Sequence, residues 1–506
     1  MFNFASVLDR SAHRYADRVA LSEADRELTH AELSVRVQAL AVALRQLGLG
    51  AGDIIAVLLY NRIEFVEIML AANHIGAAVL PLNYRLSPAE WQFILEHSEA
   101  VAILTEAEFI GGMDDLTPKL PAVRHKLSVD AAAGGWVEYE SLVTANLGSS
   151  TPIADVEPDA LQRLMYTSGT TSRPKGVMIS HANLIWKNLG HILEFGLTDA
   201  DNTLVCGPLY HVGGMDLPGL ATLHAGGRMS LVRRFDAAAV LTAIETLRPS
   251  NVWLAPSMMN ALLQLPDILD RDTSSIRFIT GGGEKMPIPL LDRIGRAFPD
   301  AWFADAYGLT ETVSGDTVND AAHMRSKVGS VGRPVAHVRI AVLDDNGEPI
   351  PAGELGEVAV RGPKVMTGYW RDPEATRKTL REGWFHTGDI GRLDEDGYLY
   401  IEDRKKDMIV SGGENIATPE VERVLYEHPD VLEAAVIGMS HPRWGEVPKA
   451  FVVLRPGSSL DAGTLQEFCR ERLAKYKVPA EISYIDALPR TPSGKVLKRN
   501  LRETDA

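Results

Sequence analysis

Cysteine is almost absent from this chain. Only Cys206 and Cys469 occur among the 506 residues, far apart in the sequence and in no C-x-x-C or Cys/His metal spacing. This count argues against a disulfide framework and against a structural zinc site. Two reduced, buried thiols are typical of a reducing compartment, so we expect a cytoplasmic protein.

Long hydrophobic runs are missing as well. The stretch 68–82 is interrupted by Asn73 and His74, and no run reaches the roughly 18 residues that a membrane span needs. The N-terminal sequence MFNFASVLDR lacks the basic stretch, apolar run and cleavage site of a signal peptide. We therefore expect no stable insertion into a membrane.

The chain also lacks an excess of positive charge. Its formal net charge is -16, from 51 Lys and Arg against 67 Asp and Glu. Such a surface repels nucleic-acid phosphates, and the sequence contains no local basic patch that would overcome the repulsion. We expect small-molecule partners and no nucleic acid, and the oligomeric state stays open, with a homodimer as one arrangement.

The chain is long enough for several domains, because a single hydrophobic core stops growing well below 506 residues. From about 50 to 305, short apolar runs alternate with helix-length amphipathic stretches, which predicts parallel strands covered by helices. From about 330 to 402, strands follow one another through tight turns at Asn346-Gly347 and Asp396-Gly397. A helix, two strands and a second helix then predict a small terminal domain.

The fold class that follows is α/β. We predict a large N-terminal domain at 1–402, with parallel-rich sheets, covering helices and a β-rich subdomain. The charged cluster 403–407 is the predicted hinge, and 408–506 is the predicted small, mobile α+β lid domain.

The most informative segment is YTSGTTSRPKG at 166–176, which follows a short apolar run and precedes a helix-compatible stretch. Its hydroxyls, glycines and lysine can surround anionic oxygens with backbone N–H groups, O–H donors and one positive charge. This predicts a phosphate-binding loop, although a Ser/Thr-rich surface turn is the alternative for the segment taken alone. It is not a Walker loop, because the chain has no G-x-x-x-x-G-K-[ST].

The segment resembles the YTSGTTGxPKG motif of the adenylate-forming superfamily, which includes acyl-CoA synthetases, peptide-synthetase adenylation domains and beetle luciferases. The resemblance continues in family order over nearly the whole chain. It includes GGGEKM at 281, DAYGLTE at 305, GELGEVAVRG at 353, WFHTGD at 384, DRKKDMI at 403, SGGEN at 411 and PRTPSGK at 489. One departure is Ser172, where the family usually has glycine. Loop geometry or nucleotide affinity differs here if that position needs a positive φ.

The resemblance implies how the triphosphate is held. Residues Thr167, Ser168, Gly169, Thr170, Thr171 and Lys175 would bind the β- and γ-phosphates of ATP. Glu311, with Thr167, would hold Mg²⁺, and Thr310 would contact the α-phosphate. A lone glutamate is usually a solvated surface charge, but this one directly follows the Y-G-L-T motif.

The nucleoside contacts come from other motifs. The backbone of Gly283 and Glu284 and the ring of Tyr307 would form the walls of the adenine slot, and Asp305 would accept from the exocyclic amine. Asp389 is suited to accept both ribose hydroxyls, because a carboxylate has four lone-pair sites. Arg404 would supply the second ribose or phosphate contact.

The C-terminal motifs imply residues for two successive half-reactions. Lys495 matches the family's catalytic lysine, whose compact charge suits bridging the attacking carboxylate and the α-phosphate. The family rotates its lid about the residue that is Lys406 here. Gly412 and Gly413 would then leave a narrow path for the pantetheine arm. Residues 444–446 and 476–477 are weaker candidates for coenzyme A contacts.

The acid substrate would lie near His211, Val212 and Gly213, because the family has an aromatic or histidine residue at the position of His211. The predicted lining also includes Trp186, 214–215, 253–256, Val313 and Ser314. These residues are mostly apolar or small and include no Arg or Lys for a second carboxylate. We therefore expect a monocarboxylic acid with an apolar tail, fatty or aryl.

The resemblance identifies the chain as an AMP-forming acid:coenzyme A ligase, with Mg²⁺ as cofactor and ATP and coenzyme A as co-substrates. A stand-alone enzyme that loads a carrier protein is the nearest alternative, because a carrier presents the same pantetheine arm. A luciferase-type oxidation and a nucleotide-binding protein without catalysis are the remaining alternatives. The second is disfavoured by the joint presence of Lys495, Glu311, Asp389 and Arg404.

Overall fold

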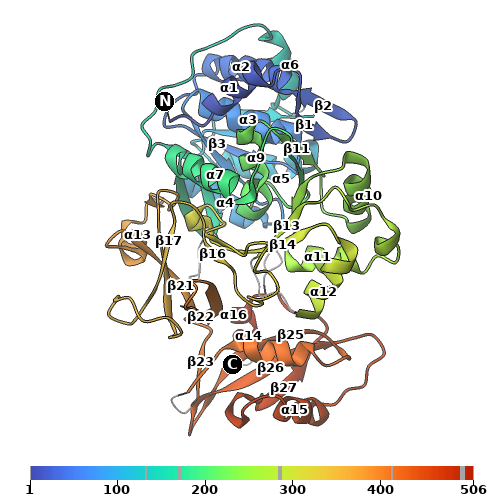
Figure 1. The fold of residues 1–506 in the computed structure, drawn as a ribbon. Helices are drawn as coiled ribbons and strands as arrows, with labels where there is room; N and C mark the ends of the chain where they lie inside the picture. The colour runs from blue at the N-terminus through green and yellow to red at the C-terminus, as the bar shows by residue number, and fades with distance from the viewer. Residues whose placement is uncertain are drawn as a thin grey trace. The chain divides into compact units, whose positions relative to one another are not determined.

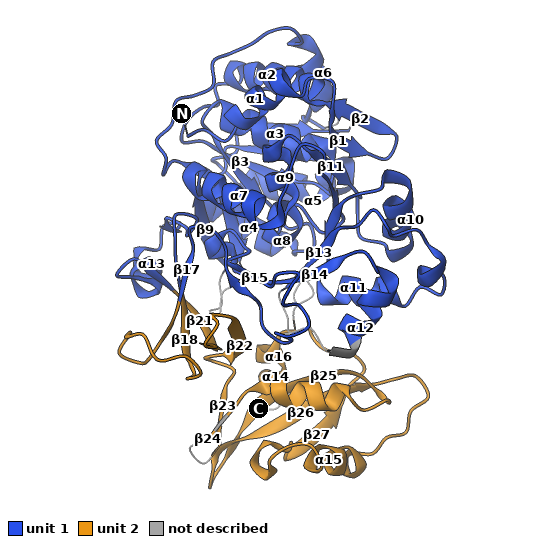
Figure 2. Cartoon of the chain, viewed as in Figure 1, with its two compact units in different colours: residues 1–340, 360–385 blue, residues 341–359, 386–506 orange. Residues whose placement is uncertain are grey.

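The structure is a computed structural model that describes residues 2–130, 134–167, 174–282, 288–411, 414–490 and 496–504. Contacts within the chain divide it into two compact units (Figure 2): unit 1 is 1–340 with 360–385, and unit 2 is 341–359 with 386–506. Among the described residues, no helix is both long and apolar enough to cross a membrane.

Unit 1 contains a nine-stranded sheet in the order β16-β15-β14-β13-β12-β10-β11-β1-β2. Its strands are β1 (Val19–Glu23), β2 (Arg26–Thr29), β10 (Asn202–Val205), β11 (Arg228–Leu231), β12 (Asn251–Trp253), β13 (Phe278–Gly282), β14 (Trp302–Tyr307), β15 (Thr317–Val318) and β16 (Arg333–Pro334). The inner pairs are parallel, and antiparallel pairs close both edges.

A second sheet has the order β19-β9-β8-β4-β3-β5-β6-β7. Its strands are β3 (Ile54–Leu58), β4 (Ala78–Pro81), β5 (Ala102–Thr105), β6 (His125–Ser128), β7 (Val137–Glu138), β8 (Leu161–Thr167), β9 (Lys175–Ser180) and β19 (Gly368–Tyr369). Most of its pairs are parallel, while β9 runs antiparallel to both β8 and β19.

Helices pack on both faces of these sheets (Figure 1). The helices of unit 1 are α1 (Ser6–Arg14), α2 (His30–Gln46), α3 (Ile63–His74), α4 (Pro88–Ser98), α5 (Ala107–Leu116), α6 (Tyr139–Ala145), α7 (His181–Phe195), α8 (Val212–Asp216), α9 (Gly219–Ala225), α10 (Ala237–Leu247), α11 (Pro256–Leu263), α12 (Ile288–Ala297) and α13 (Pro373–Thr379). Short 3₁₀ turns are η1 (Thr117–Lys119), η2 (Ile268–Asp270) and η3 (Thr310–Thr312).

Strand β3 shows how the layers arise, because its successive side chains face opposite sides of the sheet. Ile55 and Val57 join a core with α2, α3, α7 and α9, which also contains residues of the nine-stranded sheet. Ile54 and Leu58 join a second core with α4 and α5. A third core lies under α10, α11 and α12 on the nine-stranded sheet. Strands buried on both faces explain the continuous apolar runs of the sequence.

Local sequence fixes where several helices begin. The Thr29 side chain accepts from the N–H of Glu32, whose carboxylate accepts in return at the start of α2. Ser87 and Glu90 make the same reciprocal cap on α4. Each cap satisfies N–H groups that have no partner within the helix.

Unit 2 contains a five-stranded sheet. Four strands are antiparallel, in the order β24-β23-β26-β25, and the fifth strand, β27, runs parallel to β26. Its elements are β23 (Ile409–Ser411), β24 (Glu414–Ile416), α14 (Thr418–Tyr426), β25 (Val431–His441), β26 (Gly445–Leu454), α15 (Ala462–Arg470), η4 (Lys475–Lys477), β27 (Glu481–Tyr484) and α16 (Lys498–Thr504). One face packs on α14 and α15, and the other packs on Leu488 and Leu501.

The predicted hairpins form a sheet in the order β17-β18-β21-β20, with β22 paired to β21. Its strands are β17 (Arg339–Leu343), β18 (Gly356–Arg361), β20 (Leu380–Arg381), β21 (Trp384–Leu393) and β22 (Leu399–Arg404). Gly347 and Gly397 have φ of 87° and 79°, which confirms both predicted turns.

The predicted fold class is confirmed: an α/β chain with a large N-terminal part and a smaller C-terminal α+β part. The compact units divide the chain at other positions than 402, because 341–359 and 386–402 cluster with the C-terminal part. Packing within one structure defines compact units, whereas a hinge is defined by movement. The hinge at 403–407, the boundaries beside it and the mobility of the lid therefore stay predictions.

Candidate active site

The two ends of the predicted phosphate loop lie opposite each other. Strands β8 and β9 form an antiparallel pair in which Thr167 faces Lys175. Ser168, Gly169, Thr170, Thr171 and Ser172 lie outside the described residues. The structure thus places the ends of the predicted loop side by side and leaves the phosphate contacts of its centre as predictions.

Glu311 lies in a short turn directly after β14. Thr310 begins the 3₁₀ turn η3, and the Thr312 hydroxyl oxygen accepts from the Leu309 N–H at 3.1 Å. The Glu311 carbonyl accepts from the N–H of Met366 at 2.8 Å. Its carboxylate oxygen Oε1 accepts from the Tyr369 hydroxyl at 2.9 Å. The segment around β19 therefore holds both the main chain and the side chain of Glu311.

Tyr369 also links Glu311 to the phosphate loop. The Lys175 ammonium lies 5.0 Å from the centre of the Tyr369 ring, within the range of a cation–π interaction. Burial raises the pKa of Tyr369, and the negative charge of Glu311 raises it further, so the hydroxyl stays a donor. Sequence reasoning missed Tyr369, although Gly368-Tyr369-Trp370 closely follows the GELGEVAVRG motif and was the available signal.

Two of the predicted adenine residues, Asp305 and Tyr307, lie at the carboxyl end of β14, which is paired in parallel with β13. In the pairing of β13 with β14, Gly281 lies opposite Asp305 and Gly282 opposite Ala306. Gly282 has a φ of 154°, and a Cβ there would lie 2.3 Å from the Ala306 carbonyl oxygen. Only glycine fits this close approach. Asp305 and Tyr307 are half-buried, and the predicted Gly283 and Glu284 lie outside the described residues.

His211 caps the short helix α8 and lies beside an aromatic ring. Its Nδ1 accepts from the Gly213 N–H at 3.1 Å. The ring centres of His211 and Trp253 are 6.0 Å apart, with 33° between the ring planes. A Cβ on Gly207 or Gly213 would approach the Trp253 indole to 2.5 Å, so the indole lies directly on glycine backbone. Val212 is buried in α8.

The other predicted lining residues differ in their surroundings and in how far they are buried. The Trp186 ring packs edge-on against His337 at 4.9 Å, while Val313 is fully buried and Ser314 is 6% exposed. Val313 thus belongs to the packed core of unit 1 rather than to an open surface.

Buried positive charges lie close to these residues, which sequence reasoning did not foresee. Arg163 donates to Asp216 at 2.6 Å, and Lys187 lies 3.6 Å from the same carboxylate. Burial lowers the pKa of Lys187 to about 7. Lys364 lies 2.8 Å from Asp316. Each cation has a protein carboxylate beside it, so none is offered to a second substrate carboxylate, and the prediction of a monocarboxylic acid stays a prediction.

Unit 2 carries the predicted ribose contacts on two paired strands. Asp389 in β21 lies opposite Arg404 in β22, and the Arg404 Nε is 3.0 Å from Asp389 Oδ1. Asp389 is 4% exposed and Arg404 is about one third exposed, so the pair has one buried and one accessible partner. Lys406 follows β22, and burial lowers its pKa. The predicted Gly412, Gly413 and Lys495 lie outside the described residues.

Magnesium is the predicted metal, and Glu311 is the carboxylate predicted to hold it. Within the described parts of the chain, no group of three or more His, Cys, Asp and Glu side chains could hold a metal. Mg²⁺ commonly uses one or two carboxylates together with substrate phosphates. Glu311 fits this pattern, because the Tyr369 hydroxyl fixes one carboxylate oxygen and leaves its orientation defined.

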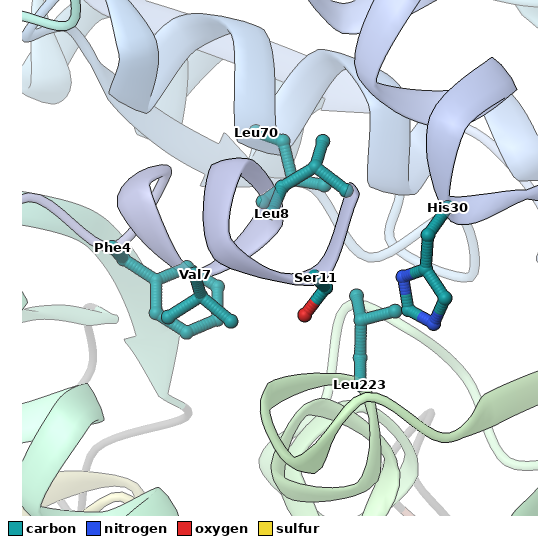
Figure 3. A pocket seen from close by; sticks show the side chains of 7 residues that line it. All are labelled: Phe4, Val7, Leu8, Ser11, His30, Leu70 and Leu223. Carbon is teal, nitrogen blue, oxygen red and sulfur yellow. The ribbon is translucent and has the colours of Figure 1, made fainter. Parts of the chain in front are cut away.

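Unit 1 contains an open pocket of about 210 Å³ beside Lys175. It is lined by Phe93, His97, Pro174, Lys175, Trp370, Arg371 and Asp372. A narrow void lies elsewhere in the same unit, under α1, and is lined by Phe4, Val7, Leu8, Ser11, His30, Leu70 and Leu223 (Figure 3).

The void under α1 is a packing defect rather than a second site. Burial lowers the pKa of His30, and its Nε2 donates to the Gly226 carbonyl at 3.0 Å, so the ring is neutral. Apart from that ring and the Ser11 hydroxyl, the lining is aliphatic or aromatic (Figure 3). The void therefore offers no charged group, and the candidate active site remains the region of Lys175, Tyr369 and Glu311.

Comparison with known proteins gives matches over the whole chain. A model of AMP-binding enzymes matches residues 8–370, and a model of the AMP-binding enzyme C-terminal domain matches residues 420–495. A feruloyl-CoA synthase from an Amycolatopsis species is 40% identical over 500 residues, with 97% of each chain covered.

Solved structures agree with this match. An anthranilate CoA ligase in complex with anthranoyl-AMP has a TM-score of 0.92 at 28% identity, covering 99% of this chain and 97% of that one. The o-succinylbenzoate CoA synthetase of Bacillus subtilis with its acyl-adenylate OSB-AMP has a TM-score of 0.88 at 34% identity, covering 98% and 97%. The same synthetase has also been solved with ATP and a magnesium ion.

Proposed function

The chain belongs to the AMP-binding enzyme family and is an AMP-forming acid:coenzyme A ligase, and we propose that its acid substrate is an aromatic monocarboxylic acid. The observation that carries the proposal is the ring pair of His211 and Trp253, 6.0 Å apart, at the residues predicted to hold the acid. Aromatic rings prefer offset or tilted neighbours at such separations, so this pair favours an aryl tail over a flexible alkyl chain.

The aromatic surface has a fixed position in this chain. The Trp253 indole lies on the backbone of Gly207 and Gly213, and either glycine with a Cβ would displace it. Similar proteins act on aromatic acids: one forms feruloyl-CoA and another holds anthranoyl-AMP. Each buried Arg and Lys near the predicted acid residues faces a protein carboxylate, which supports a substrate with a single carboxylate.

In the first half-reaction, a carboxylate oxygen of the acid attacks the α-phosphorus of ATP, and the bond to the bridging oxygen of pyrophosphate breaks. Catalysis consists of alignment and charge neutralisation, because two anions must meet in line. The loop that starts at Thr167 and ends at Lys175 binds the β- and γ-phosphates. Thr310 contacts the α-phosphate, and Lys495 bridges it to the incoming carboxylate.

Magnesium is the proposed cofactor, and it neutralises phosphate charge when bound. Glu311 is its protein carboxylate, and Thr167 is the second proposed ligand. The Tyr369 hydroxyl keeps the Glu311 carboxylate in one orientation. A structure of the similar synthetase from Bacillus subtilis contains ATP and a magnesium ion, which supports magnesium as the cofactor.

The nucleoside contacts follow the family motifs. Gly283, Glu284 and Tyr307 enclose adenine, and Asp305 accepts from its amine. Asp389 accepts the ribose hydroxyls, with its position fixed by the cross-strand contact to Arg404.

In the second half-reaction, the thiol of coenzyme A releases its proton to solvent and the sulfur attacks the acyl carbonyl carbon. The bond from that carbon to the phosphate oxygen then breaks and AMP leaves. We assign Lys406 as the pivot of the C-terminal domain, and Gly412 and Gly413 as the path of the pantetheine arm. A cytoplasmic location fits the two cysteines, Cys206 and Cys469, which are buried free thiols.

The experiment that tests the substrate is pyrophosphate release with Mg²⁺ and ATP over matched acids. Cinnamic, benzoic and arylacetic acids are compared with straight-chain acids of equal carbon number, each with and without coenzyme A. We expect kcat/KM at least about tenfold higher for one aromatic class, since pocket discrimination of small groups spans about 10- to 200-fold. Preference for a straight-chain acid would overturn the aromatic assignment.

Two further arms of the same assay test the chemistry. Turnover that coenzyme A does not accelerate would instead support transfer to a carrier protein. Lys495→Ala should abolish adenylation and spare thioester formation from supplied acyl-adenylate. Equal loss of both half-reactions would contradict the role given to Lys495.

A further inference from the structure

The turn that follows Glu311 has an unusual backbone. Val313, Ser314 and Gly315 have φ of 56°, 62° and 62°. A non-glycine residue in this left-handed region is unfavourable, and a β-branched valine there is a genuine outlier. Such a conformation persists only where surrounding contacts impose it.

Lys364 supplies the central contacts. Its ammonium nitrogen is 2.6 Å from the Ser314 carbonyl oxygen, 2.8 Å from that of Gly315 and 2.8 Å from Asp316 Oδ1. An ammonium has three donors, and three protein oxygens lie around this one. Lys364 is 2% exposed and Asp316 is fully buried.

Other residues also hold the turn in place. The Thr312 hydroxyl donates to Asp316 Oδ2 at 2.5 Å. The His191 Nε2 donates to the Gly315 carbonyl at 3.1 Å, and burial keeps the pKa of His191 well below its usual range. A Cβ on Gly308 would lie 2.4 Å from the Gly315 nitrogen, so the turn packs closely on the chain that leads into it.

The segment that carries Lys364 also reaches Glu311 directly. Met366 donates its N–H to the Glu311 carbonyl, and the Tyr369 hydroxyl donates to the Glu311 carboxylate. The segment is itself anchored to α7, because the Asn183 side chain donates at 2.8 Å to the carbonyls of residues 363 and 365. Glu311 therefore lies between a strained turn held by Lys364 and a strand that holds its side chain.

From this geometry we propose that Lys364 is a positioning residue for adenylation, which holds the strained turn so that Thr310 and Glu311 present their side chains to Mg·ATP. The proposal rests on the proposed role of Glu311. Lys364 acts through the turn and not on the acid, because the oxygens around its ammonium belong to the protein and its side chain is buried.

The test uses the full chain with both charges removed. In Lys364→Met with Asp316→Asn, no buried carboxylate is left without its cation, and the new amide oxygen can still accept from the Thr312 hydroxyl. Four measurements are compared with wild type: Mg·ATP binding by calorimetry without acid, Mg²⁺ dependence of pyrophosphate exchange, thioester formation from supplied acyl-adenylate, and Tm. Lys187→Met is the matched control, because it removes another fully buried ammonium while Arg163 still pairs with Asp216.

We expect the double variant to bind Mg·ATP and to adenylate about 10- to 100-fold less well, as loss of a group that orients a metal ligand does. The Mg²⁺ concentration at which the double variant exchanges pyrophosphate fastest should rise. Its rate of thioester formation from supplied acyl-adenylate should stay near that of wild type. The control should keep the Mg²⁺ dependence of wild type. Equal loss in both half-reactions, in step with Tm, would show a merely structural role and overturn the proposal. Unchanged Mg·ATP binding would overturn it as well.

A parallel variant separates failure of this proposal from failure of the proposed function. If Glu311→Gln leaves the Mg²⁺ dependence unchanged, the role of Glu311 is wrong and the positioning role of Lys364 falls with it. If Glu311→Gln shifts the Mg²⁺ dependence and the Lys364 double variant does not, the proposal for Lys364 alone is refuted.

Discussion

Removing one hydroxyl from Tyr369 tests how Glu311 is held. In Tyr369→Phe the ring remains, so its contact with the Lys175 ammonium at 5.0 Å is preserved. The change deletes the hydroxyl that donates to Glu311 Oε1 at 2.9 Å and that also contacts the Thr379 side chain. An effect on the Mg²⁺ dependence then reports on the orientation of the Glu311 carboxylate.

The size of the effect follows from the type of hydrogen bond. A hydrogen bond to a charged group contributes about 1.5–3 kcal/mol, and the partner left behind loses its orientation as well. At about 1.4 kcal/mol per tenfold change, this predicts a fall in kcat/KM for Mg·ATP of about 10- to 150-fold. The Mg²⁺ concentration needed for half-maximal pyrophosphate exchange should increase, while KM for the acid should change little.

Tyr139→Phe is the matched control. The Tyr139 hydroxyl also donates to a buried glutamate, Glu67, at 2.6 Å, and this pair lies among the helices α2, α3 and α6. Its loss should lower Tm without changing the Mg²⁺ dependence. If Tyr369→Phe exchanged pyrophosphate with the wild-type Mg²⁺ requirement, the hydroxyl would not position a metal ligand and the reasoning would be refuted.

Three further predictions concern other parts of the chain. Asp389→Asn should raise KM for ATP about 10- to 100-fold, because a charged acceptor paired with Arg404 is lost; a wild-type KM would exclude the ribose role. Gly282→Ala should destabilise the fold by about 1–3 kcal/mol, lower Tm and weaken ATP binding, because its Cβ would meet the Ala306 carbonyl at 2.3 Å. Unchanged unfolding and ATP titrations would contradict this clash. Burial lowers the pKa of His181 to about 4, so between about 4 and 6.5 the unfolded chain binds the extra proton and stability falls as the pH falls. Urea unfolding at pH 7 and pH 5 should differ by about 2 kcal/mol from this residue, and His181→Gln should reduce that difference.

Local patterns in the sequence were enough to predict several strands and turns and to identify the nucleotide-binding motifs. The apolar run DIIAVLL at 53 is one of the runs that predict parallel strands covered by helices, and β3 (Ile54–Leu58) is buried on both faces. The pairs Asn346-Gly347 and Asp396-Gly397 predict turns, and both glycines have a positive φ. The sequence predicts Thr167 and Lys175 as phosphate contacts and Asp389 and Arg404 as ribose or phosphate contacts, and the structure places each of these two pairs on neighbouring strands. The contacts with the nucleotide stay predictions.

Only the tertiary structure decided how Glu311 is supported. Lys364 and Tyr369 lie more than fifty residues after Glu311, and a buried lysine has the same letter in the sequence as a solvated one. Their partners, the carbonyls of 314 and 315 and the Glu311 carboxylate, are set by the packing of β19 and by three successive left-handed residues. Periodicity and motifs encode contacts along the chain, whereas these contacts depend on which distant segments come to lie side by side.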